Sequence, residues 1–183
     1  MVARTSGLCI FGTAIGSCGI AWSESGQVVG VQLPESDERA TRARMQSRFP
    51  GVPECSPPPA IEAIVRRIRA LLEGQPDPLL DVPLDMSEVP DFNRRVYEIT
   101  RAIPPGRTLT YGEVAARLGE PGAARAVGQA LGHNPFAPVV PCHRVLAAGT
   151  AAGGFSAGGG VATKLRMLQI EKAQLGSEPG LFD

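Results

Sequence analysis

The hydrophobic pattern of this chain changes near residue 90, and that change constrains the fold most. Ahead of it, short apolar runs over 8–12, 19–22 and 28–33 are separated by small and polar residues. Runs of this length between Gly and Ser residues are typical of β-strands. The close spacing of the runs, with a Ser-Glu-Ser-Gly turn over 23–26, predicts a meander of antiparallel strands.

A helix is expected after this sheet. Apolar residues recur at helical spacing over 59–73, behind three consecutive prolines and ahead of Gly74. Proline suits the first turn of a helix and glycine its end, so both ends of this segment are marked. The charged stretch 35–48 predicts a second, surface helix, and 79–86 predicts a linker that contains a short edge strand. We therefore expect an α/β domain over 1–88.

From Pro90 onward, the spacing of apolar residues is helical. Thr110 and Glu113 have the spacing of a capping box, which predicts that a helix begins there. After this short helix and a turn that contains glycine, a second helix is expected over 123–131. Two short helices joined in this way predict a helix-turn-helix, within an all-helical domain over 89–183.

The composition fits one or two compact domains without a membrane segment. The chain has 183 residues, of which 43% are hydrophobic, and this is enough for a substantial core. It lacks an uncharged apolar run of about 18 residues and the pattern of a secretory signal, so we expect a soluble, cytoplasmic protein. The four cysteines and two histidines are too scattered for a metal cluster, which predicts free thiols and no bound metal.

The net charge is zero, but the charges are unevenly distributed. Residues 1–88 carry 8 basic and 11 acidic side chains, whereas residues 89–172 carry 10 basic and 5 acidic ones. A locally basic region is typical of a site for a polyanion. A solvated charged surface is the simpler alternative, and the charge pattern taken alone favours it.

The second helix of the predicted helix-turn-helix carries mostly small residues. Ala123, Ala124 and Gly128 would let the backbone approach a partner closely, and Arg125 and Gln129 are its long polar side chains. A regulator that reads the major groove would need more Arg, Asn or Gln along this helix. The pattern fits a minor-groove contact in which Arg125 replaces an extruded base. Packing of the helix in a core explains the small residues equally well.

Cys142 lies in the sequence Val-Val-Pro-Cys-His-Arg-Val over 139–145, which is the clearest candidate for chemistry. A cysteine with a histidine nearby has the setting of an activated nucleophile, because the thiolate is the reactive form. Neighbours in a strand point to opposite faces, so contact between Cys142 and His143 requires a bend or a bridging water. A cysteine in an apolar stretch is more often a small buried side chain, and a thiol hydrolase is a third interpretation.

The motifs around Cys142 resemble the active-site region of the O6-alkylguanine-DNA alkyltransferases. The similarity rests on Pro-Cys-His-Arg-Val over 141–145, on Ala-Ala-Arg-Ala-Val-Gly over 123–128 and on Asn134-Pro135, and it extends over about 89–172. The first half is similar to this family only in strand pattern and length. Members of the family move the alkyl group of O6-methylguanine in double-stranded DNA to their own cysteine, once per molecule and without a cofactor.

The resemblance implies catalytic roles for four residues. Cys142 would accept the alkyl group, His143 would take the thiol proton through a water, and Glu171 would orient the imidazole. Tyr111 would contact the phosphate beside the lesion and help protonate the leaving base. This assignment is chemically sound, because attack on the alkyl carbon needs a thiolate in line with the bond to O6. Arg144 is expected to be structural.

The resemblance also implies a DNA-binding helix and a substrate pocket. Arg125 would enter the base stack from a helix that places Ala123, Ala124 and Gly128 against the minor groove. The loop over 155–164 is longer and richer in glycine than is usual in the family, so one wall of the pocket differs. The implied pocket residues are Asn134, Val145, Phe155 and Ser156.

From this resemblance we expect a two-domain α/β (α+β) chain, with a ribonuclease H-like amino-terminal domain and a winged-helix-like helix-turn-helix. The expected partner is DNA that contains O6-alkylguanine, with O4-methylthymine as a second candidate lesion, and the protein is expected to be a monomer. Two alternatives remain open: a sensor that binds alkylated DNA without chemistry, and a helix-turn-helix regulator. Sensor-type relatives have tryptophan or another residue in place of Cys142, which argues against the first alternative.

Overall fold

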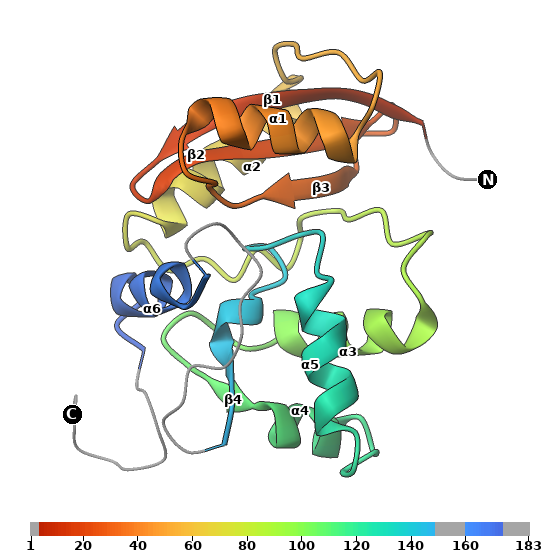
Figure 1. The fold of residues 1–183 in the computed structure, drawn as a ribbon, viewed down its shortest axis with the longest axis vertical. Helices are drawn as coiled ribbons and strands as arrows, with labels where there is room; N and C mark the ends of the chain where they lie inside the picture. The colour runs from red at the N-terminus through yellow and green to blue at the C-terminus, as the bar shows by residue number, and fades with distance from the viewer. Residues whose placement is uncertain (1–3, 149–159, 174–183) are drawn as a thin grey trace.

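A three-stranded sheet forms the first layer of the fold. The computed structural model of the protein describes residues 4–148 and 160–173. β1 (Thr5–Thr13), β2 (Gly16–Ser23) and β3 (Val28–Gln32) form an antiparallel sheet in the order β1-β2-β3. Figure 1 shows this sheet above the carboxy-terminal half, with β3 nearest to that half. The predicted meander of short strands is confirmed.

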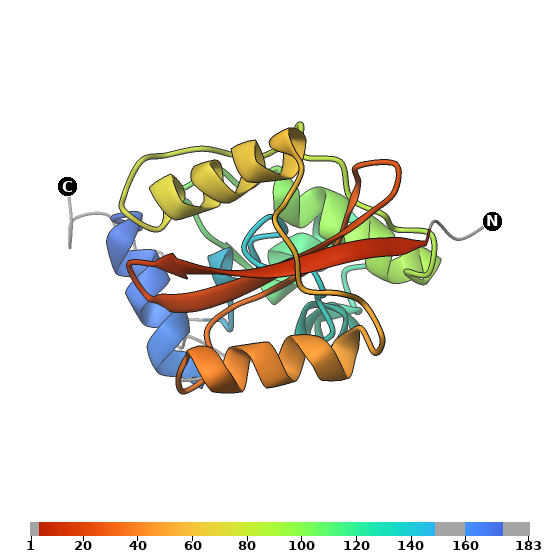
Figure 2. The ribbon, with the colours of Figure 1, turned by 90° about the horizontal axis from the view of Figure 1, so that it is seen from above.

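Two helices cover opposite faces of the sheet, as Figure 2 shows: α1 (Glu38–Arg48) and α2 (Pro59–Leu71). Successive strand residues point to opposite faces, so the two sides of β2 pack on different helices. Ala21 packs with Met45 of α1, and the alternate residues of β2 join the core formed with α2. A Cβ at Gly19 would lie 2.5 Å from Met45 Cγ, so the close approach of α1 requires glycine there.

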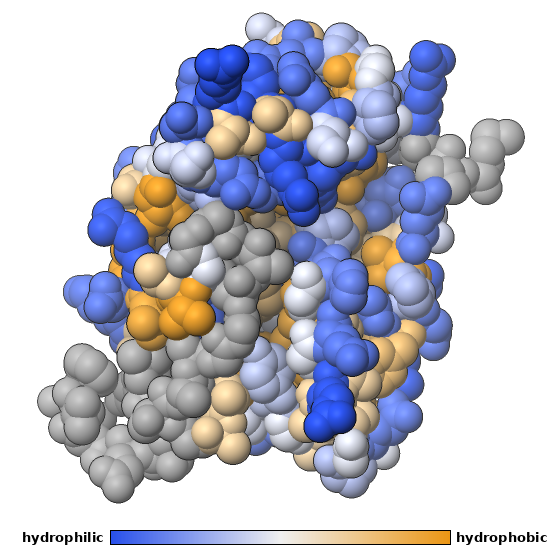
Figure 3. Space-filling model, in the orientation of Figure 1, coloured by the Kyte–Doolittle hydropathy of each residue, from blue (hydrophilic) through white to orange (hydrophobic). Residues whose placement is uncertain are grey.

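Local sequence explains both helices. α1 begins after Asp37, whose side chain accepts a hydrogen bond from the Ala40 amide at 2.7 Å. The outer side of α1 is largely hydrophilic in Figure 3, as its charged sequence predicts. α2 has proline in its first turn, and the apolar residues at helical spacing are buried: Ile61, Ile64, Val65, Ile68 and Leu71.

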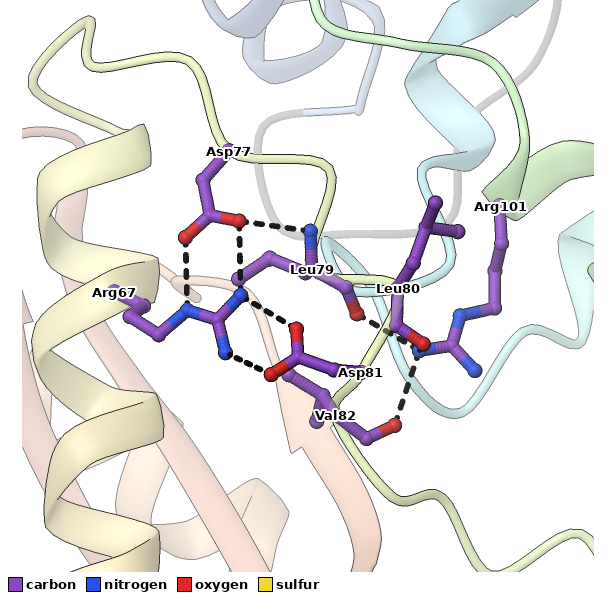
Figure 4. A network of polar contacts seen from close by, with 7 residues as sticks. All are labelled: Arg67, Asp77, Leu79, Leu80, Asp81, Val82 and Arg101. Carbon is purple, nitrogen blue, oxygen red and sulfur yellow. Dashed lines mark hydrogen bonds and ion pairs between the residues drawn. The ribbon is translucent and has the colours of Figure 1, made fainter.

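Two arginines fix the connector between α2 and α3 (Asp91–Arg101), as Figure 4 shows. Arg67 of α2 forms ion pairs with Asp77 at 2.8 Å and with Asp81 at 2.7 Å. Arg101 of α3 donates to main-chain carbonyls of the connector at 2.8, 3.2 and 3.0 Å, those of Leu79, Leu80 and Val82. The connector is therefore held by side chains from both of the helices that it joins.

The carboxy-terminal half is mostly helical. In addition to α3, it contains α4 (Tyr111–Arg117), α5 (Ala124–Gly132), the 3-10 turn η1 (Cys142–Arg144) and α6 (Gly160–Ile170). The prediction of an all-helical half is wrong in one place, because β4 (Leu109–Thr110) pairs in parallel with β5 (Val145–Leu146). The backbone is extended before α4 begins and again after η1 ends, so these two short segments can pair.

The main hydrophobic core extends through both halves of the chain. It includes Ile20 of the sheet as well as Val96, Val127 and Val140 of the carboxy-terminal half. The edge strand expected within 79–86 is reduced to an isolated bridge between Val28 and Leu84. A boundary between two domains at residue 88 stays a prediction.

The predicted helix-turn-helix is present as α4 and α5. Its start is a capping box: the Glu113 amide donates to Thr110 Oγ1 at 3.0 Å, and the Thr110 amide donates to Glu113 Oε1 at 3.1 Å. Gly119 follows α4 with a φ of 79°, a conformation that favours glycine and turns the chain toward α5. The capping box therefore fixes the position of Tyr111, the first residue of α4.

We expect Thr110→Ala to lower the free energy of unfolding by about 1 kcal/mol, because α4 loses a side-chain cap. Thr110→Ser is the matched control, since serine keeps the hydroxyl group and should retain most of the stability. Urea unfolding of the three proteins measures the difference. Equal losses in both variants would show that the hydroxyl group does not stabilise the helix start.

Candidate active site and DNA-binding face

The segment around Cys142 is bent, not extended. Cys142 begins η1 directly after Pro141, and the Arg144 amide donates to the Pro141 carbonyl at 2.9 Å. Cys142 and His143 therefore do not lie in a strand, because the turn gives both residues a 3-10 conformation. Strand pairing starts only at Val145. The backbone is therefore bent here, as contact between the Cys142 and His143 side chains would require.

A carboxylate, an imidazole and a guanidinium form a buried network beside Cys142. His143 Nε2 lies 2.8 Å from Glu171 Oε1, and Arg144 donates to the same carboxylate at 2.7 and 3.0 Å. Arg144 also donates to the Ile103 carbonyl at 2.9 Å. The side chains of His143, Arg144 and Glu171 are 0%, 2% and 4% exposed. A buried carboxylate needs such partners, since an unpaired one would be very costly.

The network sets the protonation of its members. Burial opposes ionisation of Glu171, but hydrogen bonds from His143 and Arg144 outweigh burial and lower the pKa of Glu171 to about 2. Burial lowers the pKa of His143 below its usual value, although Glu171 opposes this shift. His143 is therefore neutral at pH 7, donates to the carboxylate through Nε2, and keeps Nδ1 as its acceptor. Nδ1 is buried and has no hydrogen-bond partner within the described residues.

Cys142 is buried but lines two cavities. Cys142 is 8% exposed, and burial raises the pKa of its thiol, while a hydrogen bond with Asn134 and the charge of Lys164 oppose that rise. Asn134 donates to the Val140 carbonyl at 2.8 Å and accepts from the Phe136 amide at 2.9 Å. The thiol is therefore mainly protonated in the free protein, so a base is needed to activate it.

Lys164 is a site residue that the sequence analysis did not single out. It is fully buried, and its Nζ donates to the Val145 carbonyl at 2.8 Å. The same Nζ lies 5.8 Å from the centre of the Tyr111 ring. Burial lowers the pKa of Lys164 to about 8. In the sequence, Lys164 stands out as a charged residue within an apolar helical stretch. Its burial could not be predicted, because it depends on the packing of α6 against η1.

The larger cavity is a cleft of about 850 Å³ between α4, α5 and the segment after β5. It is lined by Tyr111, Ala124, Arg125, Gly128 and Cys142, among others. A Cβ at Gly128 would lie 3.9 Å from the Tyr111 ring, in ordinary contact, so these two residues are adjacent. Burial raises the pKa of Tyr111, so its phenol stays protonated. Arg125 is exposed at the rim.

The structure brings together most of the predicted site residues that it describes. Tyr111, Arg125 and Cys142 share the cleft, whereas Ala123 packs against the core beside it. Val145 is buried directly after η1, and its carbonyl already accepts from Lys164. Phe155 and Ser156 lie outside the described residues, as does the first half of the loop over 155–164.

The described ranges hold no group of three or more His, Cys, Asp or Glu residues that could bind a metal ion. Their helices are also too short or too polar to cross a membrane. Cys9, Cys18, Cys55 and Cys142 are all free thiols.

We expect the free energy of unfolding to fall as the pH decreases below about 6.5, because the unfolded chain protonates His143 and the folded protein does not. The slope is at most about 1.4 kcal/mol per pH unit for this one proton. His143→Gln should reduce the slope between pH 6.5 and 5 in urea unfolding. His133→Gln, at the exposed end of α5, should keep it because His143 is still present. An unchanged slope in His143→Gln would contradict a neutral, buried imidazole.

The sequence of this chain is similar to that of proteins of known family. A family model described as "6-O-methylguanine DNA methyltransferase, DNA binding domain" matches residues 91–173. A methylated-DNA–protein-cysteine methyltransferase of Mycobacterium tuberculosis is 43% identical over 126 residues, which is 69% of this chain and 74% of the relative. The protein of the same name from Methanothermobacter thermautotrophicus is 38% identical over 158 residues, 86% of this chain and 80% of the relative.

Solved structures agree with these relatives. The crystal structure of Mycobacterium tuberculosis OGT in complex with DNA has a TM-score of 0.72 at 34% identity, and the match covers 90% of this chain and 92% of that one. A mixed fold of a small antiparallel sheet and helices is common to both. Sequence and fold therefore agree over most of the chain, which belongs to the methylated-DNA–protein-cysteine methyltransferase family.

Proposed function

We propose that this protein repairs alkylated DNA by transferring the alkyl group from O6 of guanine to its own Cys142. The observation that carries this proposal is the pairing of a buried thiol with a neutral, carboxylate-bound imidazole next to a cleft. That cleft opens between the two helices of a DNA-binding domain. O6-methylguanine is the main substrate that we propose, and O4-methylthymine is a second one.

The network gives each group a role in the transfer. His143 Nδ1 accepts the thiol proton through a bridging water, and Glu171 stabilises the imidazolium that forms. The Cys142 thiolate attacks the alkyl carbon, a carbon–sulfur bond forms, and the bond from that carbon to O6 breaks. Guanine leaves as an anion and takes a proton from the Tyr111 phenol. The His143 imidazolium then releases its proton and the Tyr111 phenolate regains one, so the net result is transfer of one proton from the thiol to guanine. The reaction as written needs no cofactor.

The thioether product explains why each molecule acts once. A carbon–sulfur bond to an alkyl group is not reversed by the groups around Cys142, because they supply neither a nucleophile nor a leaving group for the reverse step. The protein would therefore be consumed in stoichiometric amounts. This is single-turnover chemistry with the protein itself as the alkyl acceptor.

The residues around the cleft also suggest how the alkylated base reaches Cys142. A base inside a duplex is inaccessible to a buried thiol, so the nucleotide must rotate out of the stack. The small residues Ala123, Ala124 and Gly128 allow close approach of α5 to the minor groove, and Arg125 would fill the vacated space. Tyr111 would contact the adjacent phosphate. The pocket for the flipped base would involve Asn134, Val145, Phe155 and Ser156.

We extend the proposal to the organisation of the chain. The sheet with α1 and α2 would be a ribonuclease H-like domain over 1–88, and α4 with α5 would belong to a winged-helix-like domain over 89–183. Because one chain contains the thiol, the base and the cleft, the protein would act as a monomer. Free cysteines fit a reducing compartment such as the cytoplasm.

Intact-protein mass spectrometry after incubation with a duplex that contains O6-methylguanine tests this function. We expect the wild-type protein to gain the mass of one methyl group and no more, on Cys142. Cys142→Ala should gain nothing, because the acceptor is missing. Cys55→Ala, which removes an exposed thiol that does not line the cleft, is the matched control and should react like the wild type.

Two outcomes would contradict the proposal. If the wild-type protein binds the lesion tightly but gains no mass, it is a sensor of alkylated DNA. If Cys142→Ala still gains a methyl group, another residue is the acceptor.

A further inference from the structure

Arg48 connects the amino-terminal sheet to the segment that precedes Cys142. It lies in the last turn of α1, and its side chain is partly buried. Its guanidinium donates to the Val31 carbonyl at 2.8 Å and to Gln32 Oε1 at 3.1 Å. It also donates to the Pro135 carbonyl at 3.1 Å, a contact between residues that lie far apart in the sequence.

The Pro135 carbonyl accepts a second hydrogen bond from the amino-terminal half of the chain. The Val31 amide at the edge of the sheet donates to it at 2.9 Å. A carbonyl oxygen accepts two hydrogen bonds through its two lone pairs, so both are used here. The position of Pro135 is therefore fixed by β3 and α1, neither of which belongs to the DNA-binding domain matched by the family model.

From Pro135, the connection continues to the backbone of Cys142 through short contacts. The neighbouring Asn134 donates to the Val140 carbonyl at 2.8 Å, and that carbonyl also accepts from the Cys142 amide at 2.8 Å. Asn134 also lowers the pKa of the Cys142 thiol, against the effect of burial. A second cavity, of about 280 Å³, is lined by Arg48, Asn134 and Cys142 together.

We propose that Arg48 is a positioning residue for alkyl transfer, because it holds the Asn134-Pro135 turn in the place from which Asn134 supports Cys142. This inference rests on the proposed function, since it assigns to the amino-terminal half a part in that reaction. The geometry favours arginine over lysine: a planar guanidinium reaches carbonyls in both halves at once, whereas one ammonium group does not provide the same fixed fork. A small displacement of the thiol would slow an in-line attack severely.

The test compares Arg48→Met and Arg48→Lys with the control Arg44→Met. Methionine keeps the apolar stem without the donors, and Arg44 lines the same cavity one turn earlier with no hydrogen bond or ion pair in the described structure. Three quantities are measured: the single-turnover rate of methyl transfer, the Kd for an unmodified duplex, and the pH profile of Cys142 alkylation by iodoacetamide. Circular dichroism reports the folded fraction.

We expect Arg48→Met to slow methyl transfer by roughly 10- to 100-fold, with the Kd for DNA changed by less than about twofold. Its iodoacetamide profile should shift to higher pH, because displacement of Asn134 weakens its lowering of the Cys142 pKa. Arg48→Lys should give an intermediate rate, and Arg44→Met should behave like the wild type.

The proposal is overturned if folded Arg48→Met transfers at the wild-type rate with an unchanged profile. It is also overturned if the rate falls only in proportion to the folded fraction, since Arg48 would then be merely structural. A wild-type protein that accepts no methyl group would instead refute the proposed function. The iodoacetamide profile would still decide whether Arg48 positions Cys142.

Discussion

Burial of the Glu171 carboxylate is the constraint on which the rest of the site depends. A carboxylate that is 4% exposed is tolerated only with strong partners, and Arg144 supplies both the compensating charge and two hydrogen bonds. Because Arg144 carries the positive charge, His143 can remain neutral and still donate to Glu171. If the imidazole had to neutralise the carboxylate alone, it would hold its second proton and could not accept one from Cys142.

Elements that are distant in the sequence hold this network in place. Arg144 is anchored to the Ile103 carbonyl just after α3, and Glu171 follows α6 directly, so the turn at Cys142 connects two helices that are distant in sequence. The pairing of β4 with β5 places the start of α4, and thus Tyr111, next to the same turn. The amino-terminal sheet contributes through Pro135, whose carbonyl accepts from β3 and α1. Each layer therefore restrains the segment that carries the thiol.

Local patterns in the sequence predict the elements better than the site. The strand runs, the apolar spacing of α2 and the capping box at Thr110 each depend on a few neighbouring residues, and all are confirmed. Cys142 and His143 are candidates from their own local sequence, whereas Glu171 was identified by resemblance, because a separation of 28 residues between His143 and Glu171 carries no local signal. The 3-10 turn, the buried Lys164 and the contact of Arg48 with Pro135 depend on tertiary packing, which no short stretch of sequence encodes.

The proposed reaction requires a neutral His143, and nitrogen NMR of the imidazole measures its protonation state. The chain has two histidines, so His143→Gln is sufficient to assign the signals. At pH 7 we expect a neutral ring with the proton on Nε2 and an unprotonated Nδ1 that is free to accept a hydrogen bond. A doubly protonated ring, or a proton on Nδ1, would contradict it, since neither form could take the thiol proton through the nitrogen that Glu171 leaves free.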